Sequence, residues 1–291
     1  MLSDVIGNPL SLIASGPTFV DANAESSGAE ILETLDKYQL RDKLSSTVLQ
    51  HLQQVPITDK KRNTVDVTNV LIGDNSIAVS QAAEKARSVG FETCVWSCAI
   101  EGEAKQVGKA FAILTFHLLL LRAGFEPVPA TLSIVSKMLP HLSSEWDMMC
   151  AKLPTLSFPL CIIGAGETTV AVKGGGKGGR NQEVVVGYCL ALKEIMSNDL
   201  SSDLCEKKDA LQLNKVSFTS FASDGQDGPT DAAGACVTAE QALTWKTSDM
   251  QAALDNNDSY TFLQSQPGCL LKTGLTGTNV MDLYFLIFHI S

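Results

Sequence analysis

The chain has 291 residues, 45% hydrophobic and 19% charged, which is long enough for two domains and excludes a largely disordered protein. Its formal net charge of −10 argues against a nucleic-acid-binding surface, since such surfaces need clustered lysine and arginine. The eight scattered cysteines have no C-x-x-C spacing, which indicates reduced thiols rather than a disulfide framework or a zinc site.

No targeting segment is visible in the sequence. The N-terminus lacks a basic stretch followed by an apolar core, and the most apolar helical candidate, residues 110–123, is too short to span a bilayer. We therefore expect a cytoplasmic protein, with mitochondria as the alternative for longer forms. We expect neither a membrane nor a nucleic acid as partner, and we keep a homo-oligomer as an alternative to a monomer.

The first half of the chain alternates helical and strand patterns. Apolar spacing predicts helix over residues 28–54, and a β-branched run predicts a strand over 65–72. An alanine-rich helix over 76–88 and a strand over 91–99 complete a predicted βαβ unit, which implies a parallel sheet. A long helix follows at 103–123.

The second half begins after a proline-rich stretch that we interpret as a domain boundary. The fold class expected is α/β, with a partial Rossmann-like parallel-sheet domain at 1–157 and a C-terminal α/β domain at 158–291. The patterns there predict strands at 160–164, 168–172, 216–222 and 283–287, a helix buried on both sides at 181–196, and helical segments within 238–264.

The strongest functional signal is the sequence GGGKGGRNQE at residues 174–183. Glycines allow backbone N–H groups to converge on a small anion, and a helix start adds unpaired N–H groups and a positive dipole end. Lys177 and Arg180 add full charges, and arginine can bind two oxygens at once. We predict an oxyanion or phosphate site that includes Gly178, Gly179 and Asn181, with a plain flexible turn as the alternative.

Two common nucleotide motifs fit this stretch poorly. The glycines satisfy G-x-G-x-x-G, but a glycine run satisfies many patterns, so a Rossmann-type dehydrogenase is a weak alternative. The Walker A pattern fails because Gly178, not serine or threonine, follows Lys177.

Two small turns could also contact a ligand. The sequence IASGP at 13–17 places Ser15 and Gly16 in a hydroxyl-rich turn with donors for a ligand. Glu167 follows the strand expected at 160–164, where ligand sites in α/β folds usually lie, and could orient a substrate hydroxyl or the water shell of a cation. In both places the alternative is a structural turn.

Three carboxylates follow the strand expected at 216–222. Asp224, Asp227 and Asp231 lie within eight residues in a glycine-rich segment, and such crowding favours a bound cation or an array of donors. Mg²⁺ held by one or two carboxylates and phosphate oxygens fits this composition, and an aspartate could accept the proton of an attacking hydroxyl. We predict catalytic roles for Asp224 and Asp227 and a metal-binding role for Asp231, with helix caps and turns as the alternative.

Taken together, these motifs resemble the glycerate kinase family that carries the MOFRL domain. The matching segments, in the family's order, are 3–18, 166–170, 178–183, 224–234 and 273–283. The resemblance covers nearly the whole chain and corresponds to the latter part of a longer enzyme, with the family's N-terminal segment lacking. It identifies 1–157 as the C-terminal part of the first domain and 158–291 as the MOFRL domain.

The resemblance implies a phosphotransferase that acts on an alcohol group. It implies ATP-dependent phosphorylation of D-glycerate to 2-phosphoglycerate, with Mg²⁺, in a cleft between two α/β domains. Arg180 matches the family's active-site arginine, which would bind the glycerate carboxylate or the transferred phosphoryl group. The alternative function is a non-catalytic short form that binds ligand or a full-length partner.

Overall fold

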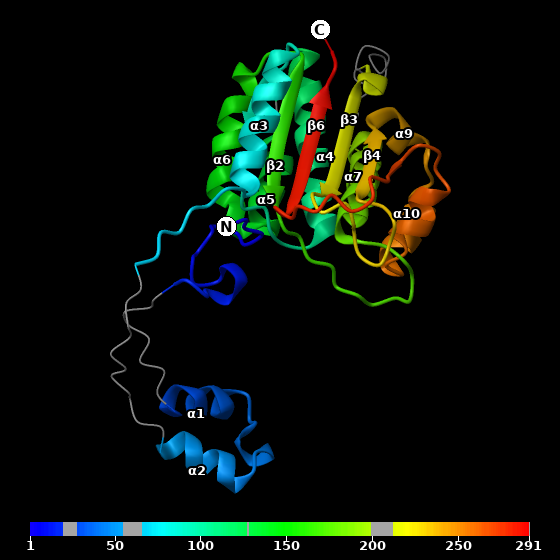
Figure 1. Ribbon diagram of the computed structural model, residues 1–291. Helices are drawn as coiled ribbons and strands as arrows, with labels where there is room; N and C mark the ends of the chain where they lie inside the picture. The colour runs from blue at the N-terminus through cyan, green and yellow to red at the C-terminus, as the bar shows by residue number, and fades with distance from the viewer. Residues whose placement is uncertain (20–27, 55–65, 127, 199–211, 291) are drawn as a thin grey trace. The chain divides into compact units, whose positions relative to one another are not determined.

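The computed structural model describes residues 1–19, 28–54, 66–126, 128–198 and 212–290. The chain divides into two compact units, Pro9–Val70 on the one hand and Met1–Asn8 with Leu71–Ser291 on the other (Figure 1). The expected domain boundary at residue 157 falls inside the larger unit, so that division stays a prediction about family segments.

The smaller unit contains the helices expected from the pattern of residues 28–54. A 3₁₀ turn, η1 (Ile13–Ser15), precedes α1 (Gly28–Lys37), η2 (Arg41–Lys43) and α2 (Ser46–Gln54). The two α-helices approach closely at Gly28, where an added Cβ would lie 1.7 Å from the carbonyl oxygen of Leu52. Arg41 of η2 pairs with Asp36 of α1 at 2.7 Å.

The larger unit is built on a six-stranded mixed sheet in the order β1-β2-β6-β3-β4-β5. β1 and β2 are parallel, and the remaining four pairs of neighbouring strands are antiparallel. The α/β class is therefore confirmed, although the parallel part of the sheet is small. The strands are β1 (Glu92–Val95), β2 (Leu160–Gly166), β3 (Val216–Ala222), β4 (Gly234–Thr238), β5 (Leu270–Leu271) and β6 (Asp282–Phe288).

Helices cover both faces of this sheet (Figure 1). On one face Val79 and Ala83 of α3 pack against Cys161 and Ile163, while the alternate residues of β2 point into the larger core formed by α4 and α7. The helices are α3 (Asn75–Ser88), α4 (Ala104–Arg122), α5 (Pro129–Met138), α6 (Ser143–Lys152), α7 (Arg180–Asn198), α9 (Ala239–Thr244), α10 (Thr247–Asp255) and α11 (Ser259–Gln264), with 3₁₀ turns η3 (Pro140–Leu142), η4 (Leu153–Thr155) and η6 (Leu213–Lys215).

The centre of the larger core is the contact between α4 and α7. Glycines permit close approach here, since a Cβ on Gly108 would lie 2.1 Å from the carbonyl oxygen of Val184. Within the described residues, α4 is the one helix long and apolar enough to cross a bilayer, but 78% of that span is buried inside the protein. Its apolar surface is thus explained by its place in the core.

Several expected elements differ in the structure. Residues 66–72 form no strand, Val65 lies outside the described residues, and residues 168–172 contribute only a single bridge between Thr169 and Glu103. A β-branched run becomes a strand only where a partner offers backbone groups, which local sequence does not reveal. β4, by contrast, was not predicted, because its small residues Gly234 and Ala235 give a weak strand signal.

Candidate active site

Three strand ends meet at one edge of the sheet. The first residue of β6, Asp282, lies in register with Gly166 at the end of β2 and with Ala222 at the end of β3. Glu167 and Asp224 therefore leave the sheet at the edge where Asp282 enters it. Such a convergence is where α/β folds commonly place ligand sites.

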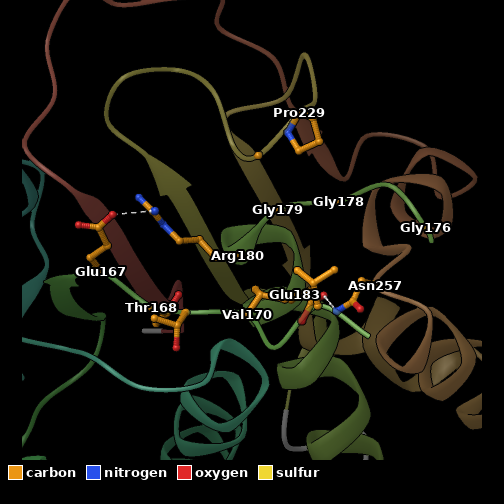
Figure 2. A pocket seen from close by; sticks show the side chains of 13 residues that line it. Glu167, Thr168, Val170, Gly176, Gly178, Gly179, Arg180, Glu183, Pro229 and Asn257 are labelled. Atoms are coloured by element: carbon orange, nitrogen blue, oxygen red, sulfur yellow. Dashed lines mark hydrogen bonds and ion pairs between the residues drawn. The ribbon is translucent and has the colours of Figure 1, made fainter. Parts of the chain in front are cut away.

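A pocket of about 590 Å³ opens beside this edge (Figure 2). It combines charged, polar and apolar side chains with backbone that carries no side chain, a common composition for a small-molecule site. Its lining comprises Glu167, Thr168, Thr169, Val170, Val172, Gly176, Gly178, Gly179, Arg180, Glu183, Gly228, Pro229 and Asn257.

The side chain of Arg180, the first residue of α7, lies between two carboxylates. Its Nε and Nη2 donate to the two oxygens of Asp282 at 2.6 and 3.0 Å. Its Nη1 lies 2.8 Å from Oε1 of Glu167 (Figure 2). Burial alone would lower the pKa of Arg180, but the hydrogen bonds and charge of Asp282 outweigh it and raise the pKa. The guanidinium is therefore a permanent, oriented positive charge at the pocket.

The first half of the glycine-rich stretch does not present its N–H groups to the pocket. The N–H groups of Lys173 and Gly174 both donate to Oδ1 of Asn257, at 2.7 and 2.9 Å. Those of residues 175, 176 and 177 donate to Oδ1 and the carbonyl of Asn256 and to Oδ1 of Asp258. This part of the expected phosphate cradle is thus bound to its own protein.

The second half keeps its N–H groups open. Gly179 accepts the first helical hydrogen bond of α7, from Glu183, and so occupies the N-cap position. The N–H groups of Gly178, Gly179 and Arg180 have no acceptor within the described residues, and all three residues line the pocket. The predicted anion site is therefore narrowed to these three residues and the guanidinium.

Asp227 holds the start of α7 rather than facing the pocket. Its side chain is 2% exposed, and its two oxygens accept from the backbone N–H groups of Asn181 and Gln182 at 3.0 and 2.9 Å. Nε2 of Gln182 also donates to Oδ2 at 2.9 Å. Burial raises the pKa of Asp227, and these donors lower it in part. The contacts of Asp227, for which a catalytic role was predicted, are those of a helix cap from a distant loop.

Asn181 is a framework residue as well. It is fully buried, its Nδ2 donates to Asp227 at 3.3 Å, and its Oδ1 accepts from the hydroxyl of Ser220 at 2.6 Å. The side chain is not part of the pocket lining. Its predicted phosphate-binding role is therefore not supported by the geometry.

The other two acids of the predicted trio are separate from Asp227 in their contacts. Asp231 accepts from the hydroxyl of Tyr260 at 2.7 Å and from Nζ of Lys272 at 2.9 Å. Oδ1 of Asp224 accepts from the N–H of Gln226 at 2.9 Å. Each acid thus has its own local partners, and no group of three metal-ligating side chains occurs within the described ranges. The three carboxylates therefore do not converge on one cation site, and the metal-binding role of Asp231 stays a prediction.

Lys177 is not part of the pocket lining. Nζ of Lys177 lies 4.4 Å from the centre of the Tyr260 ring, a cation–π contact. Ser15 and Gly16 belong to the smaller unit, where both have positive φ and their N–H groups donate to the carbonyls of Leu12 and Ile13. Those N–H groups serve the turn itself.

The sequence prediction missed Asp282, Asn257 and Glu183. Glu183 is 3% exposed and accepts from Nδ2 of Asn257 at 2.8 Å, so one asparagine links the glycine-rich stretch to α7. Burial raises the pKa of Glu183, and the bond from Asn257 opposes that effect. The available signal was Asp282 itself, since a carboxylate that begins a buried apolar strand requires a partner.

The chain is similar to known proteins over nearly its whole length. The MOFRL family model matches residues 160–282, which include Glu167, Arg180 and Asp282, and a domain of unknown function (DUF4147) matches residues 1–53. The chain is 35% identical to a glycerate kinase of Macaca fascicularis, over 99% of this chain and 71% of the relative. It is also 35% identical to a glycerate kinase of Danio rerio, over 99% of this chain and 57% of that protein.

Solved structures give the same result. A crystal structure of a glycerate kinase from Thermotoga maritima superimposes with a TM-score of 0.69 at 31% identity, covering 99% of this chain and 56% of that one. A glycerate 2-kinase of Pyrococcus horikoshii is 32% identical over 99% of this chain and 54% of its own length. The chain therefore spans little more than half the length of most of these proteins.

Proposed function

The chain belongs to the glycerate kinase family, and we propose that it supplies the Arg180 site for transfer of the ATP γ-phosphoryl group to D-glycerate, giving 2-phosphoglycerate and ADP. The glycerate kinases to which the chain is similar support glycerate as the phosphate acceptor. The 2-position of the product follows the name of the Pyrococcus relative.

One observation carries this proposal. The open N–H groups of residues 178–180 and the oriented guanidinium of Arg180 line the same pocket. Phosphoryl transfer depends mainly on positioning and on stabilising charge on phosphoryl oxygens, and these groups are suited to both tasks. They would hold phosphate oxygens of the nucleotide or the carboxylate of glycerate.

The proton of the attacking hydroxyl also needs an acceptor. With Asp227 committed to the helix start, we assign this role to Asp224, which is half-buried and lies two residues beyond the end of β3.

Activity is tested on the full chain by measuring ADP release with ATP and D-glycerate. Arg180→Ala should lower turnover at least about a hundredfold, because a positioned charge at the reacting group is lost. A near-normal rate would remove Arg180 from the mechanism. Phosphorus NMR of the product distinguishes the 2-phosphate from the 3-phosphate ester.

The alternative is binding without turnover. A chain that releases no ADP, but whose melting temperature rises with D-glycerate or ATP in an Arg180-dependent way, would support a ligand-binding role, because a ligand that binds the native state stabilises it.

A further inference from the structure

The two carboxylates at Arg180 are held very differently. Asp282 is fully buried, and its backbone is fixed between β2 and β3. The side chain of Glu167 is 42% exposed and lies just beyond the end of β2. Within the described part of the chain, Arg180 is the one side-chain partner of Glu167. Asp282 is therefore a fixed partner, while Glu167 can rotate away.

The two partners also occupy different edges of the guanidinium. Asp282 takes Nε and Nη2, which fixes the plane of the group, and Glu167 takes Nη1. Arginine binds oxyanions through such pairs of N–H groups. An anion that enters the pocket would therefore compete with the carboxylate oxygen of Glu167 for Nη1.

Charge adds to this steric conflict. One guanidinium faces two carboxylates, so the group carries an excess of negative charge when both are ionised. An incoming anion would be repelled by the carboxylate of Glu167 at short range. Movement of Glu167 away from Nη1 would relieve this repulsion.

We propose that Glu167 occupies the anion-binding edge of Arg180 in the free protein and is displaced from it when a carboxylate or phosphate oxyanion binds. Asp282 acts as a positioning residue that keeps the guanidinium in place during this exchange. The identity of the anion as glycerate or a phosphoryl group rests on the proposed function, but the exchange itself does not. Anions too weak to displace Glu167 are excluded, so this residue contributes to specificity.

The first test needs no substrate. Phenylglyoxal reacts with accessible guanidinium groups, and mass spectrometry of peptides reports the reaction rate at Arg180 in the full chain. Glu167→Gln should raise that rate roughly two- to fivefold, since the loss of a half-exposed ion pair has about this effect. Glu84→Gln, an exposed residue on α3, is the matched control and should leave the rate unchanged. An unchanged or slower rate in Glu167→Gln would overturn the proposal.

The second test measures binding of inorganic phosphate and of D-glycerate by titration calorimetry. Glu167→Gln should bind the anion roughly two- to fivefold more tightly than the unmodified chain, and Glu84→Gln equally tightly. Weaker binding in Glu167→Gln would mean that Glu167 is a ligand of the anion rather than its competitor. If neither anion binds any variant, the exchange and the proposed function both fail. If phosphate binds more tightly to Glu167→Gln but D-glycerate binds no variant, the exchange stands and the proposed function fails.

Discussion

The two halves of the glycine-rich stretch look alike in sequence and differ in what their backbone does. Residues 173–177 donate their N–H groups to the turn at 256–258, whereas those of residues 178–180 remain open at the pocket. In the first half Gly174 and Gly176 lie against that turn and have no room for a side chain, whereas a Cβ on Gly175 would meet open space. In the second half the open N–H groups follow from the start of α7. Glycine content alone therefore predicts close packing as readily as it predicts a ligand.

Among the variants that test this difference between the two halves, removal of the cap on α7 should lower the free energy of unfolding most. Asp227→Ala leaves the buried N–H groups of Asn181 and Gln182 without an acceptor, and should lower the free energy of unfolding by about 3 kcal/mol or more. Urea unfolding followed by circular dichroism measures the change. Asp224→Ala is the control from the same segment, with an expected change within about 0.5 kcal/mol. Equal losses in both variants would contradict the cap.

The second largest effect is expected at Asn257, which binds the first half of the glycine-rich stretch. Asn257→Ala removes the acceptor for Lys173 and Gly174 and the donor to Glu183, and places alanine at a φ of 53°, so we expect a loss of about 2 to 3 kcal/mol. Asn257→Gly, which accepts this backbone conformation but lacks the amide, separates the two contributions. If thermal unfolding shows Asn257→Gly to be as stable as the unmodified chain, the amide contacts contribute nothing.

The stability of the protein should depend on pH through Asp282, which binds Arg180 at the end of the glycine-rich stretch. Burial raises the pKa of Asp282 to about 6, against the opposing effects of Arg180 and Asn181, while Asp227 raises it further. The folded protein thus holds a proton that the unfolded chain releases between pH values of about 4 and 6, so this residue favours folding at the acidic end and loses that contribution as pH rises. The slope is at most about 1.4 kcal/mol per pH unit.

Asp282→Asn cannot titrate and provides the comparison. Its free energy of unfolding, measured in urea across this pH range, should lack the decrease that Asp282 contributes in the unmodified chain. Parallel curves for the two proteins would show that the carboxyl of Asp282 has an ordinary pKa. Tyr284, the remaining titratable neighbour of this carboxyl, stays neutral here because burial raises its pKa.

The smallest expected effect compares adjacent glycines. A Cβ on Gly176 would lie 2.4 Å from Cβ of Asp258, while one on Gly175 would meet nothing within 4 Å. Gly176→Ala should therefore cost about 1 to 2 kcal/mol, and Gly175→Ala should be neutral within about 0.5 kcal/mol. Melting temperatures of the two variants give the answer, and a tolerated Gly176→Ala would mean that the turn at 256–258 yields easily.

Much of the framework could be predicted from local patterns, because the helices and strands concerned are long and strongly periodic. The predicted strand at 216–222 coincides with β3, and the helices expected near 76–88 and 103–123 correspond to α3 and α4. Arg180, for which an active-site role is predicted from the sequence, lines the pocket.

What the sequence could not provide were contacts between distant segments. Asp227 caps a helix that begins 47 residues earlier than it, while Asn257 and Asp282 reach the site from beyond residue 250. Neighbouring residues suggest an acidic cluster, but folding directs each acid to a different partner. A run of carboxylates therefore does not by itself specify a metal site.

The position of β6 has a consequence for biosynthesis. This strand lies in the middle of the sheet, between β2 and β3. It is formed by residues 282–288, so it leaves the ribosome after the other five strands of the sheet. Until it is made, β2 and β3 lack the strand that separates them, and each exposes an unpaired edge. The nascent protein must therefore be kept from aggregating until translation of this strand is complete, when the sheet and the partner of Arg180 are acquired together.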